Sequence, residues 1–313
     1  MDRLKELKPI IYWSRKIAEK LKLPFYTRTQ NYCVKYLARV YNDSNFKRDF
    51  QIILPLPQET DYQIVTKQPN LEPGSFDFIR DTTYNNVAVL YYGKINPNKY
   101  IDLTIDFEVR ISPRIIRTYE NKEFVAKICE HLYLDKAMSD DLEFYDCDDS
   151  KNNDLEIVKC LNNKVIASLE YGNPIPNLYT ANQALTLNKI DCGGFDSLLA
   201  SLLNKNGFKA RIVSGFWAGY KENTMHAWLE VLLPNGKLIP LDPSVQQLAQ
   251  QGRTKKSGDF GFLGSDRIVF SYGCCLPFII NGQKITIDLL QHPYLLSRDS
   301  SLHYVSRLDA KRL

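Results

Sequence analysis

The sequence has no uninterrupted apolar run that approaches the roughly 20 residues needed for a membrane-spanning helix. Its N-terminal segment, Met1 to Leu23, is broken throughout by lysine, arginine and glutamate, so it lacks the continuous apolar region of a signal peptide. We therefore expect an amphipathic N-terminal helix packed on the body of the protein, no membrane partner and a cytoplasmic location.

The chain also lacks a concentrated run of basic residues. It has 40 lysines and arginines against 36 aspartates and glutamates, a formal net charge of +4, and the basic residues are spread along the sequence. Proteins that bind nucleic acid need a concentrated basic surface to hold the phosphates. We therefore expect no nucleic-acid partner.

Closely spaced cysteine pairs are missing as well. The seven cysteines are an odd and scattered set without a CxxC pair: Cys33, Cys129, Cys147, Cys160, Cys192, Cys274 and Cys275. Structural zinc sites are usually built from such pairs, and disulfide frameworks belong mainly to exported proteins. We predict free thiols in a reducing compartment, no metal and no cofactor.

The acidic stretch 140–154 does not match a calcium-binding loop. If such a loop began at Asp146, Lys151 and Ile157 would stand where it needs glycine and glutamate. We predict a solvated linker for this stretch.

The 313 residues are enough for about two domains. Between about Gln30 and Pro113, four segments are rich in β-branched and aromatic residues and are separated by turn residues: Cys33–Tyr41, Phe50–Leu54, Val87–Tyr92 and Ile101–Ile111. This pattern predicts a β-sandwich. We assign residues 1–115 to an N-terminal domain with a helix and a β-sandwich, and residues 116–313 to a catalytic domain.

Helical and strand patterns both occur after residue 116, which predicts an α+β fold. Helices are predicted at 123–134, 155–171, 182–187 and from 192 to about 205. Strands are predicted at 210–216, 225–233, 237–241, 267–272, 277–280 and 284–287. Residues 291–313 show no clear pattern, and we expect a loosely held tail there.

Cys192 stands at the start of one predicted helix. Asp191 is a good N-cap residue, and the following apolar residues recur at helical spacing: Phe195, Leu198, Leu199, Leu202 and Leu203. Free N–H groups and the helix dipole favour an anion at this end, so a thiolate should form more easily. Gly193 and Gly194 leave room for a substrate backbone. These features make Cys192 a candidate nucleophile.

A cysteine nucleophile needs a base, and the base needs a group that orients it. Among the four histidines, His226 begins a predicted strand and shares a face with Trp228. The next strand follows the loop Pro234-Asn235-Gly236, and a three-residue loop of this type places Asp242 opposite Trp228, diagonal to His226. A two-residue loop would turn Asp242 to the other face. Pro243 is expected to block a helix and end the strand.

Each of these residues alone is more often structural. A single cysteine is usually a small buried residue, a histidine on a strand usually packs, and an aspartate before proline usually makes a turn. Together, however, the residues lie in an order that allows them to converge.

Three blocks of the sequence resemble the transglutaminase-like superfamily of cysteine enzymes. The blocks are Asp191–Phe195 with Gly207–Phe216, then Met225–Val231, then Leu241–Ser244, and the resemblance covers roughly residues 155–245. It implies a papain-like or transglutaminase-like core, with a cysteine-bearing helix on an antiparallel sheet that carries histidine and aspartate. It also implies a triad in which Cys192 is the nucleophile, His226 the base and acid, and Asp242 the orienting residue.

The superfamily includes acyltransferases, peptidases and amidases, so the resemblance implies acyl chemistry without fixing the acceptor. We expect a cysteine peptidase or amidase that acts on a peptide or protein through a thioacyl intermediate. The alternatives are a protein-glutamine acyltransferase and a non-enzymatic peptide-binding module. The Cys192 backbone N–H is a candidate oxyanion donor, with Asn182 or Gln183 as the second, and Trp217 and Tyr220 are candidate walls of a substrate groove. The sequence leaves the oligomeric state open.

Overall fold

The computed structural model describes residues 23–73, 75–120, 123–135, 142–147, 153–187, 189–297 and 299–313. The amphipathic helix predicted at the N-terminus and much of the acidic stretch 140–154 lie outside these ranges. Within them, no helix is both long enough and apolar enough to cross a membrane.

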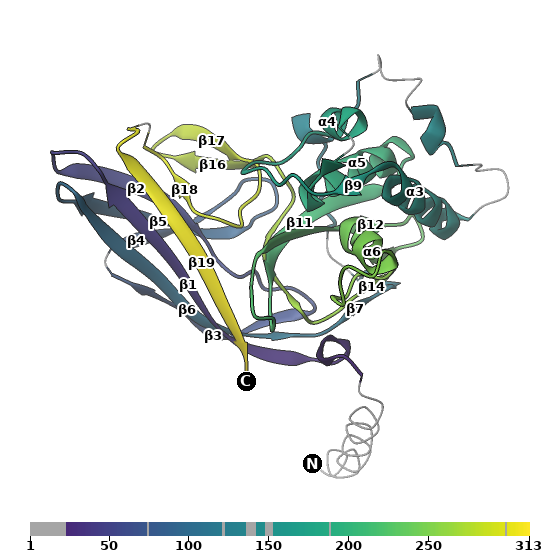
Figure 1. The fold of residues 1–313 in the computed structure, drawn as a ribbon, viewed down its shortest axis with the longest axis horizontal. Helices are drawn as coiled ribbons and strands as arrows, with labels where there is room; N and C mark the ends of the chain where they lie inside the picture. The colour runs from purple at the N-terminus through teal and green to yellow at the C-terminus, as the bar shows by residue number, and fades with distance from the viewer. Residues whose placement is uncertain are drawn as a thin grey trace, which may run out of the picture.

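The N-terminal half forms two stacked antiparallel sheets (Figure 1). One has the order β19-β1-β6-β3, with bounds Leu302–Arg312, Gln30–Asn42, Lys99–Ile111 and Gln63–Glu72. The other has the order β18-β2-β5-β4, with bounds Tyr294–Leu295, Arg48–Pro55, Val87–Ile95 and Phe76–Arg80. Alternating residues of β1 and β6 point into one apolar core between the sheets. The predicted β-sandwich is present, with β3 and β4 as strands that the pattern did not single out.

The C-terminal residues belong to this sandwich. β19 pairs with β1 from Tyr32–Arg312 to Asn42–Leu302, and β18 pairs with β2. The prediction of a loose tail at 291–313 is therefore wrong, and β18 and β19, which lie beyond the predicted boundary at residue 115, pair with strands of the N-terminal sandwich. A strand that pairs with a partner distant in the sequence leaves only a weak local pattern, since its stability comes from the partner.

The second half is built around a five-stranded sheet in the order β15-β11-β12-β13-β8. Their bounds are Arg267–Tyr272, Lys209–Trp217, Met225–Leu232, Lys237–Leu241 and Arg117–Thr118. Helices α3, α4, α5 and α6 pack beside it, at Asp154–Ser168, Ala181–Thr186, Cys192–Lys205 and Pro243–Gln250 (Figure 1). Short strands β7, β9, β10 and β14 complete it, at Arg114–Ile115, Glu170–Tyr171, Lys189–Ile190 and Phe262–Leu263. The hairpin of β16 and β17, at Leu276–Ile280 and Gln283–Ile287, packs with Ile53, Ala88 and Leu90 of the sandwich. The α+β class is as predicted.

Two helix predictions need correction. Residues 123–134 contain only the 3-10 turn η2 at Glu130–Leu132, although their apolar spacing favours an α-helix. Pro243 does not block a helix; it is the first residue of α6, with Asp242 as its N-cap. Proline suits this position because the first helical N–H has no partner within the helix and the proline φ is already helical.

The sandwich and the second half share an apolar core. Phe216, Ile268 and Phe270, from β11 and β15, pack in the same buried cluster as the sandwich residues. Polar bonds also cross between the halves, since the Tyr32 hydroxyl donates to the Ser265 carbonyl at 2.9 Å and the Gly219 N–H to that of Ala310 at 3.4 Å. The sandwich therefore supports the back of the strands that carry the candidate site.

Four of the seven cysteines are paired, so the prediction of free thiols is wrong for them. Cys129 is bonded to Cys275, and Cys147 to Cys160. Cys33, Cys192 and Cys274 are free. The first pair joins residues 146 positions apart, which no local spacing could reveal.

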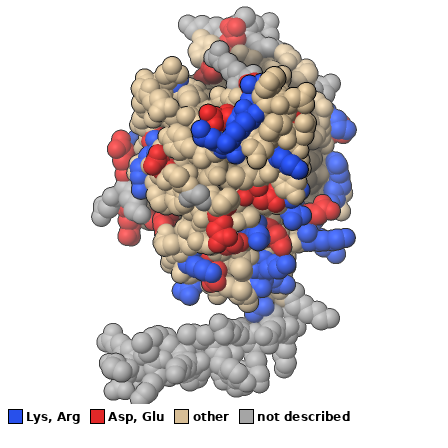
Figure 2. Space-filling view, turned by 90° about the vertical axis from the view of Figure 1, so that its left-hand side faces the viewer, with Lys and Arg blue, Asp and Glu red and all other residues tan. Residues whose placement is uncertain are grey.

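The sandwich end of the molecule faces the viewer in Figure 2, and its charges are mixed. Lysine and arginine alternate there with aspartate and glutamate, and much of the surface between them is uncharged. On this face the even spread of charge along the sequence persists in the folded chain.

Candidate active site

Cys192 is the first residue of α5, as its sequence context predicts. The Asp191 side chain caps the helix by accepting a hydrogen bond from the Gly194 N–H at 3.2 Å. Cys192 is half-buried, whereas the following helical face is fully buried against β11 and β12. The first N–H groups of a helix have no partner within it, so the Cys192 N–H is available to an acceptor at this end.

The loop after β12 has the predicted length. The Leu233 N–H donates to the Lys237 carbonyl at 2.9 Å, and Gly236 takes the left-handed φ of +78° that a glycine tolerates best. Leu229 then pairs with Leu241, which is the register expected for a three-residue loop. This register brings Asp242 onto the face of His226.

Asp242 and His226 meet in a buried contact, with 2.6 Å between Asp242 Oδ2 and His226 Nε2. The other carboxylate oxygen, Oδ1, accepts from the Val245 N–H and from the Ser244 hydroxyl, each at 3.0 Å. One aspartate thus caps α6 and holds the imidazole by one nitrogen, which leaves Nδ1 for a proton-transfer partner.

Arg267 also holds Asp242, and the sequence motifs did not identify it. It is fully buried at the start of β15 and lies 2.6 Å from Asp242 Oδ2 and 2.8 Å from Asp266 Oδ1. Burial raises the pKa of Asp242, but His226 and Arg267 outweigh it and hold that pKa well below its ordinary value. The available signal was an arginine directly before the apolar run of a predicted strand, a residue that is seldom buried without a charged partner.

Trp217 and Tyr220 do not form the predicted groove wall. Trp217 is buried and stacks on His226 with 4.3 Å between ring centroids, while the Arg267 guanidinium lies 4.2 Å from the same indole. Tyr220 donates its hydroxyl to Asp266 Oδ2 at 2.6 Å. Neither residue lines the cavity beside Cys192; both instead fix the groups around the imidazole.

The Cys192 sulfur lies next to the start of β12, where the backbone N–H of Ala227 faces it. Burial raises the thiol pKa well above its ordinary value, the negative charges of Asp191 and Asp196 raise it further, and the Ala227 N–H only partly opposes them. The expectation that the helix start makes a thiolate easier to form is therefore reversed. Asp196, one turn further along α5, is itself buried with no hydrogen-bond partner and has a raised pKa, mainly through burial.

His226 is neutral near pH 7 in this arrangement. Burial lowers its pKa below the ordinary value of 6.5, although Asp242 acts in the opposite direction. No hydrogen bond joins Cys192 to His226 among those found in the described residues. The site at rest therefore combines a neutral thiol at the start of α5 with a neutral imidazole at the start of β12, and catalytic hydrogen bonds often tighten only when substrate binds.

A cavity of about 560 Å³ opens beside Cys192. One wall is the segment 174–178, and another is formed by the end of β17 and the residues that follow it: Thr286, Ile287, Asp288, Leu289, Gln291 and His292. Tyr171, also in the lining, has a raised pKa through burial and then through its proximity to Cys192 and Asp191. Ligand cavities of this size with mixed apolar and polar walls are typical of small-molecule and peptide sites.

Asn182 and Gln183, the candidates for the second oxyanion donor, lie away from the cavity beside Cys192. Asn182 and Gln183 lie in α4, where Asn182 accepts from the Asp135 N–H and Gln183 forms a capping box with Thr180. Neither residue lines the cavity. Groups of side chains close enough to share a metal ion occur, in the described part of the chain, around Cys129 and not around Cys192.

Comparison with known proteins agrees with this geometry. Residues 145–243 match the sequence model of the transglutaminase-like superfamily. This segment contains α3, α4, α5 and the strands β11 to β13, and so it includes Cys192 on α5, His226 on β12 and Asp242 directly after β13. The chain thus contains a transglutaminase-like core, which supports cysteine-based catalysis in general. None of the curated proteins matches the chain.

One solved structure shares this fold over most of the chain. A "Putative Cysteine Protease from Cytophaga hutchinsonii" superposes with a TM-score of 0.61 at 12% identity, and the match covers 91% of each chain. The periplasmic domain of TgpA from Pseudomonas aeruginosa gives a TM-score of 0.34 at 12% identity, covering 76% of this chain and 97% of that one. The first likeness shows the fold alone, and the second is too weak to carry an argument.

Proposed function

We propose that this protein is a cysteine peptidase or amidase that cleaves amide bonds in peptides or proteins through a Cys192–His226–Asp242 triad. The observation that carries the proposal is the buried 2.6 Å contact between His226 and Asp242, together with a half-buried cysteine at a helix start whose sulfur faces the N–H of Ala227, the residue after His226. An imidazole held in one orientation beside a thiol is the arrangement that thiol acyl chemistry needs.

The reaction begins from the neutral pair. As the Cys192 sulfur attacks the carbonyl carbon, His226 takes the thiol proton on Nδ1, while Asp242 holds Nε2 and stabilises the imidazolium. The carbonyl oxygen becomes an oxyanion that accepts from the Cys192 N–H at the start of α5. Arg267 balances the charge of Asp242 throughout.

The tetrahedral intermediate collapses when the carbon–nitrogen bond breaks. His226 gives its proton to the departing amine, and a thioester remains on Cys192. Water then attacks the thioester carbonyl and passes a proton to His226. The carbon–sulfur bond breaks, the carboxylic acid leaves and the thiol is restored with that proton.

The cavity supports a peptide substrate. Its first wall contributes Pro174, Ile175, Pro176 and Leu178, and its second contributes Ile287 and Leu289. These side chains offer apolar contacts on both sides of Cys192, as an extended peptide with apolar residues near the scissile bond would need.

Hydrolysis of a mixture of quenched fluorescent peptides by the purified full chain tests the proposal. We expect Cys192→Ala to abolish cleavage and Asp242→Asn to lower kcat by roughly 10²–10⁴-fold, because the imidazole loses its orienting group. Cys33→Ala, which removes an exposed free thiol, is the matched control and should retain full activity. Undiminished cleavage by Cys192→Ala would remove the basis of the proposal.

The same assay with a labelled primary amine distinguishes hydrolysis from acyl transfer. For a hydrolase we expect free acid as the main product, with the amine incorporated at most as a minor competitor of water. Dominant incorporation of the amine at glutamine side chains would identify a protein-glutamine acyltransferase instead. Binding of peptides with neither product would favour the non-enzymatic alternative.

A further inference from the structure

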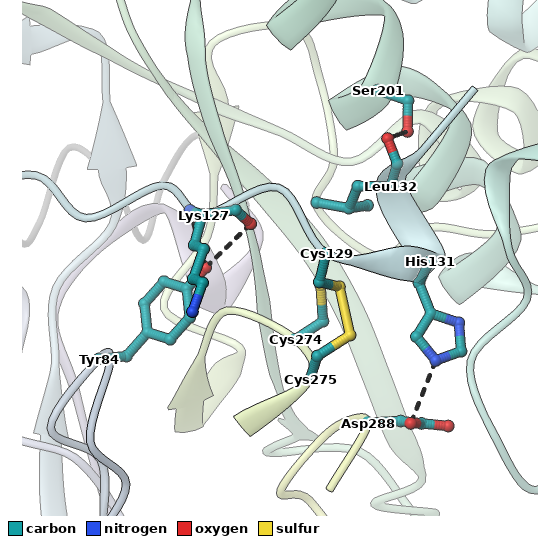
Figure 3. Close-up of a disulfide and its surroundings, with 9 residues drawn as sticks. All are labelled: Tyr84, Lys127, Cys129, His131, Leu132, Ser201, Cys274, Cys275 and Asp288. Atoms are coloured by element: carbon teal, nitrogen blue, oxygen red, sulfur yellow. Dashed lines mark hydrogen bonds and ion pairs between the residues drawn. A yellow bond between two sulfur atoms is a disulfide. The ribbon is translucent and has the colours of Figure 1, made fainter. Parts of the chain in front are cut away.

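Three cysteines gather at a second place, where the segment before η2 meets the start of β16. Cys129 is bonded to Cys275, and the sulfur of Cys274 lies 3.3 Å from the Cys129 sulfur (Figure 3). Cys274 is a free, buried thiol. Two neighbouring residues thus present sulfurs to the same partner, although only one of them is bonded to it.

A histidine and an aspartate accompany this cluster. His131 Nε2 lies 3.1 Å from Asp288 Oδ1, as the dashed line in Figure 3 marks. A ring nitrogen of His131 and the Cys275 sulfur lie within 4.8 Å of each other. The hydrogen bond to Asp288 raises the pKa of His131 more than burial lowers it. The His131 imidazole is therefore close to the sulfur that would leave if the disulfide opened, and its raised pKa favours the protonated form.

We propose that Cys129, Cys274 and Cys275 form a thiol–disulfide exchange site, in which the disulfide of Cys129 moves between Cys275 and Cys274. The Cys274 thiolate attacks the Cys129 sulfur, the bond from Cys129 to Cys275 breaks, and its electron pair goes to Cys275. His131 gives a proton to the Cys275 sulfur, and the proton released by Cys274 restores His131. One disulfide and one thiol are present before and after, so no oxidant or reductant is consumed.

The exchange is slow at neutral pH because the attacking thiol is protonated. Burial and then the charge of Asp288 raise the pKa of Cys274 to about 12. Since only the thiolate attacks, about one molecule in 10⁵ is competent at pH 7, and this fraction rises about tenfold with each pH unit. The other titratable groups facing the cluster are His131, Glu130 and Tyr84, whose own pKa is raised to about 12, mainly by burial.

The exchange site is connected to the wall of the Cys192 cavity. The Cys275 N–H donates to the Asp288 carbonyl at 3.1 Å, and both Asp288 and Leu289 line that cavity. Cys275 also has a left-handed φ of +53°, an uncommon conformation for a residue other than glycine. Release of Cys275 from Cys129 frees this backbone to move, and with it the cavity wall.

Disulfide mapping of the full chain tests the proposal without reference to any enzymatic activity. The oxidised protein is incubated at pH 7 to 10 for increasing times, blocked with N-ethylmaleimide at low pH and digested. Because the two cysteines are adjacent, fragmentation by tandem mass spectrometry is needed to place the label on Cys274 or on Cys275. We expect label on Cys274 at the start and a growing fraction on Cys275, with an initial rate that rises with pH, by less than tenfold per unit where His131 loses its proton.

Three variants strengthen the test. Cys274→Ser should keep Cys129 bonded to Cys275 at every pH. Cys275→Ser, oxidised with oxidised glutathione, should form the bond from Cys129 to Cys274. His131→Gln should slow the exchange several-fold and leave the final ratio of the two pairings nearly unchanged, which a merely structural role of His131 would not produce.

Label on Cys274 alone at every pH and time would overturn the proposal. So would general scrambling that moves the Cys147–Cys160 pair or engages Cys33, because the exchange would then not be specific to the cluster. A folded Cys275→Ser variant, verified by an unchanged melting curve, that keeps Cys129 and Cys274 as free thiols would be equally contradictory.

Discussion

The two oxygens of the Asp242 carboxylate serve two parts of the structure. Oδ1 caps α6, and Oδ2 lies between the His226 ring and the Arg267 guanidinium. An uncompensated charge in such a buried place would be costly, so Arg267 is a condition for an ionised Asp242. At the scale of single residues, the site is therefore a row of three side chains, His226, Asp242 and Arg267, and not the His226–Asp242 pair alone.

The pH dependence of catalysis follows from this row. His226 has to be neutral to accept the thiol proton, and its pKa is lowered, mainly by burial. We expect kcat/KM to fall on the acid side with a midpoint below about 6.5, the ordinary pKa of histidine. Because the pKa of Cys192 is raised, its thiol stays protonated in the acid range, and its titration does not contribute to the fall in kcat/KM there. A midpoint clearly above 6.5 in the measured profile would show that His226 is not the controlling base.

Replacement of Arg267 by methionine should weaken the fold and the site together. It leaves Asp242 and Asp266 without their shared cation, and loss of one partner of a buried ion pair typically costs about 3–5 kcal/mol. Urea unfolding of the variant measures this loss. Arg39→Met breaks a contact of the same length to Asp102 on the surface and is the matched control, with a much smaller expected effect. Equal losses in both variants would contradict the role of Arg267.

Local patterns predicted the three candidate residues but not their surroundings. Cys192 was predicted from the N-cap residue before it and the helical spacing of the apolar residues after it. Asp242 was predicted from the length of the loop that sets the strand register. Arg267, the stacking of Trp217 on His226 and the reversed pKa of Cys192 depend on segments that meet only in the folded chain. Burial in particular cannot be judged from a helix start alone, and here it outweighs the helix dipole.

At the scale of elements, the β12–β13 hairpin and α6 together fix the position of Asp242. The three-residue loop fixes the strand register, the register delivers Asp242 to the His226 face, and Asp242 then starts α6. Residue order allowed the first two steps to be predicted. The third was missed because proline was read as a helix breaker, whereas at the first helical position it favours the helix.

Shortening the hairpin loop should inactivate the protein. Deletion of Asn235 leaves a two-residue connection, which shifts the register by one and turns Asp242 away from His226. We expect peptide cleavage to fall at least as far as in Asp242→Asn. Gly236→Ala is the matched control: an added Cβ meets nothing within 4 Å, and the left-handed φ costs about 1 kcal/mol without a change in register. Wild-type activity after the deletion would contradict the account.

At the scale of the whole molecule, the last strand of the chain, β19, pairs with the first, β1, at the edge of one sandwich sheet. The sandwich packs on β11 and β15, and Arg267 is the first residue of β15. The sandwich thus supports the site from behind.

The two disulfides also bear on location, because such bonds persist mainly in oxidising compartments. The cytoplasmic location stays a prediction, and these bonds weigh against it.

Removal of residues 302–313 tests the pairing of β19 with β1. The truncation uncovers the edge of β1 and removes the buried side chains of Leu302, Leu308 and Ala310. We expect a loss of about 5 kcal/mol or more in the free energy of unfolding, together with aggregation through the exposed strand. Removal of the exposed residues 311–313 alone is the control and should cost far less. A fully stable protein without β19 would restore the prediction of a loose tail.

The most direct test of the central claim is the capture of the acyl-enzyme. The protein is mixed with a peptide mixture, quenched in acid within the first turnovers and analysed by mass spectrometry after digestion. We predict an acyl group as a thioester on Cys192, absent from Cys192→Ala and strongly reduced in His226→Ala. Peptides cleaved with no adduct on Cys192, or an adduct that forms equally on Cys33, would contradict it.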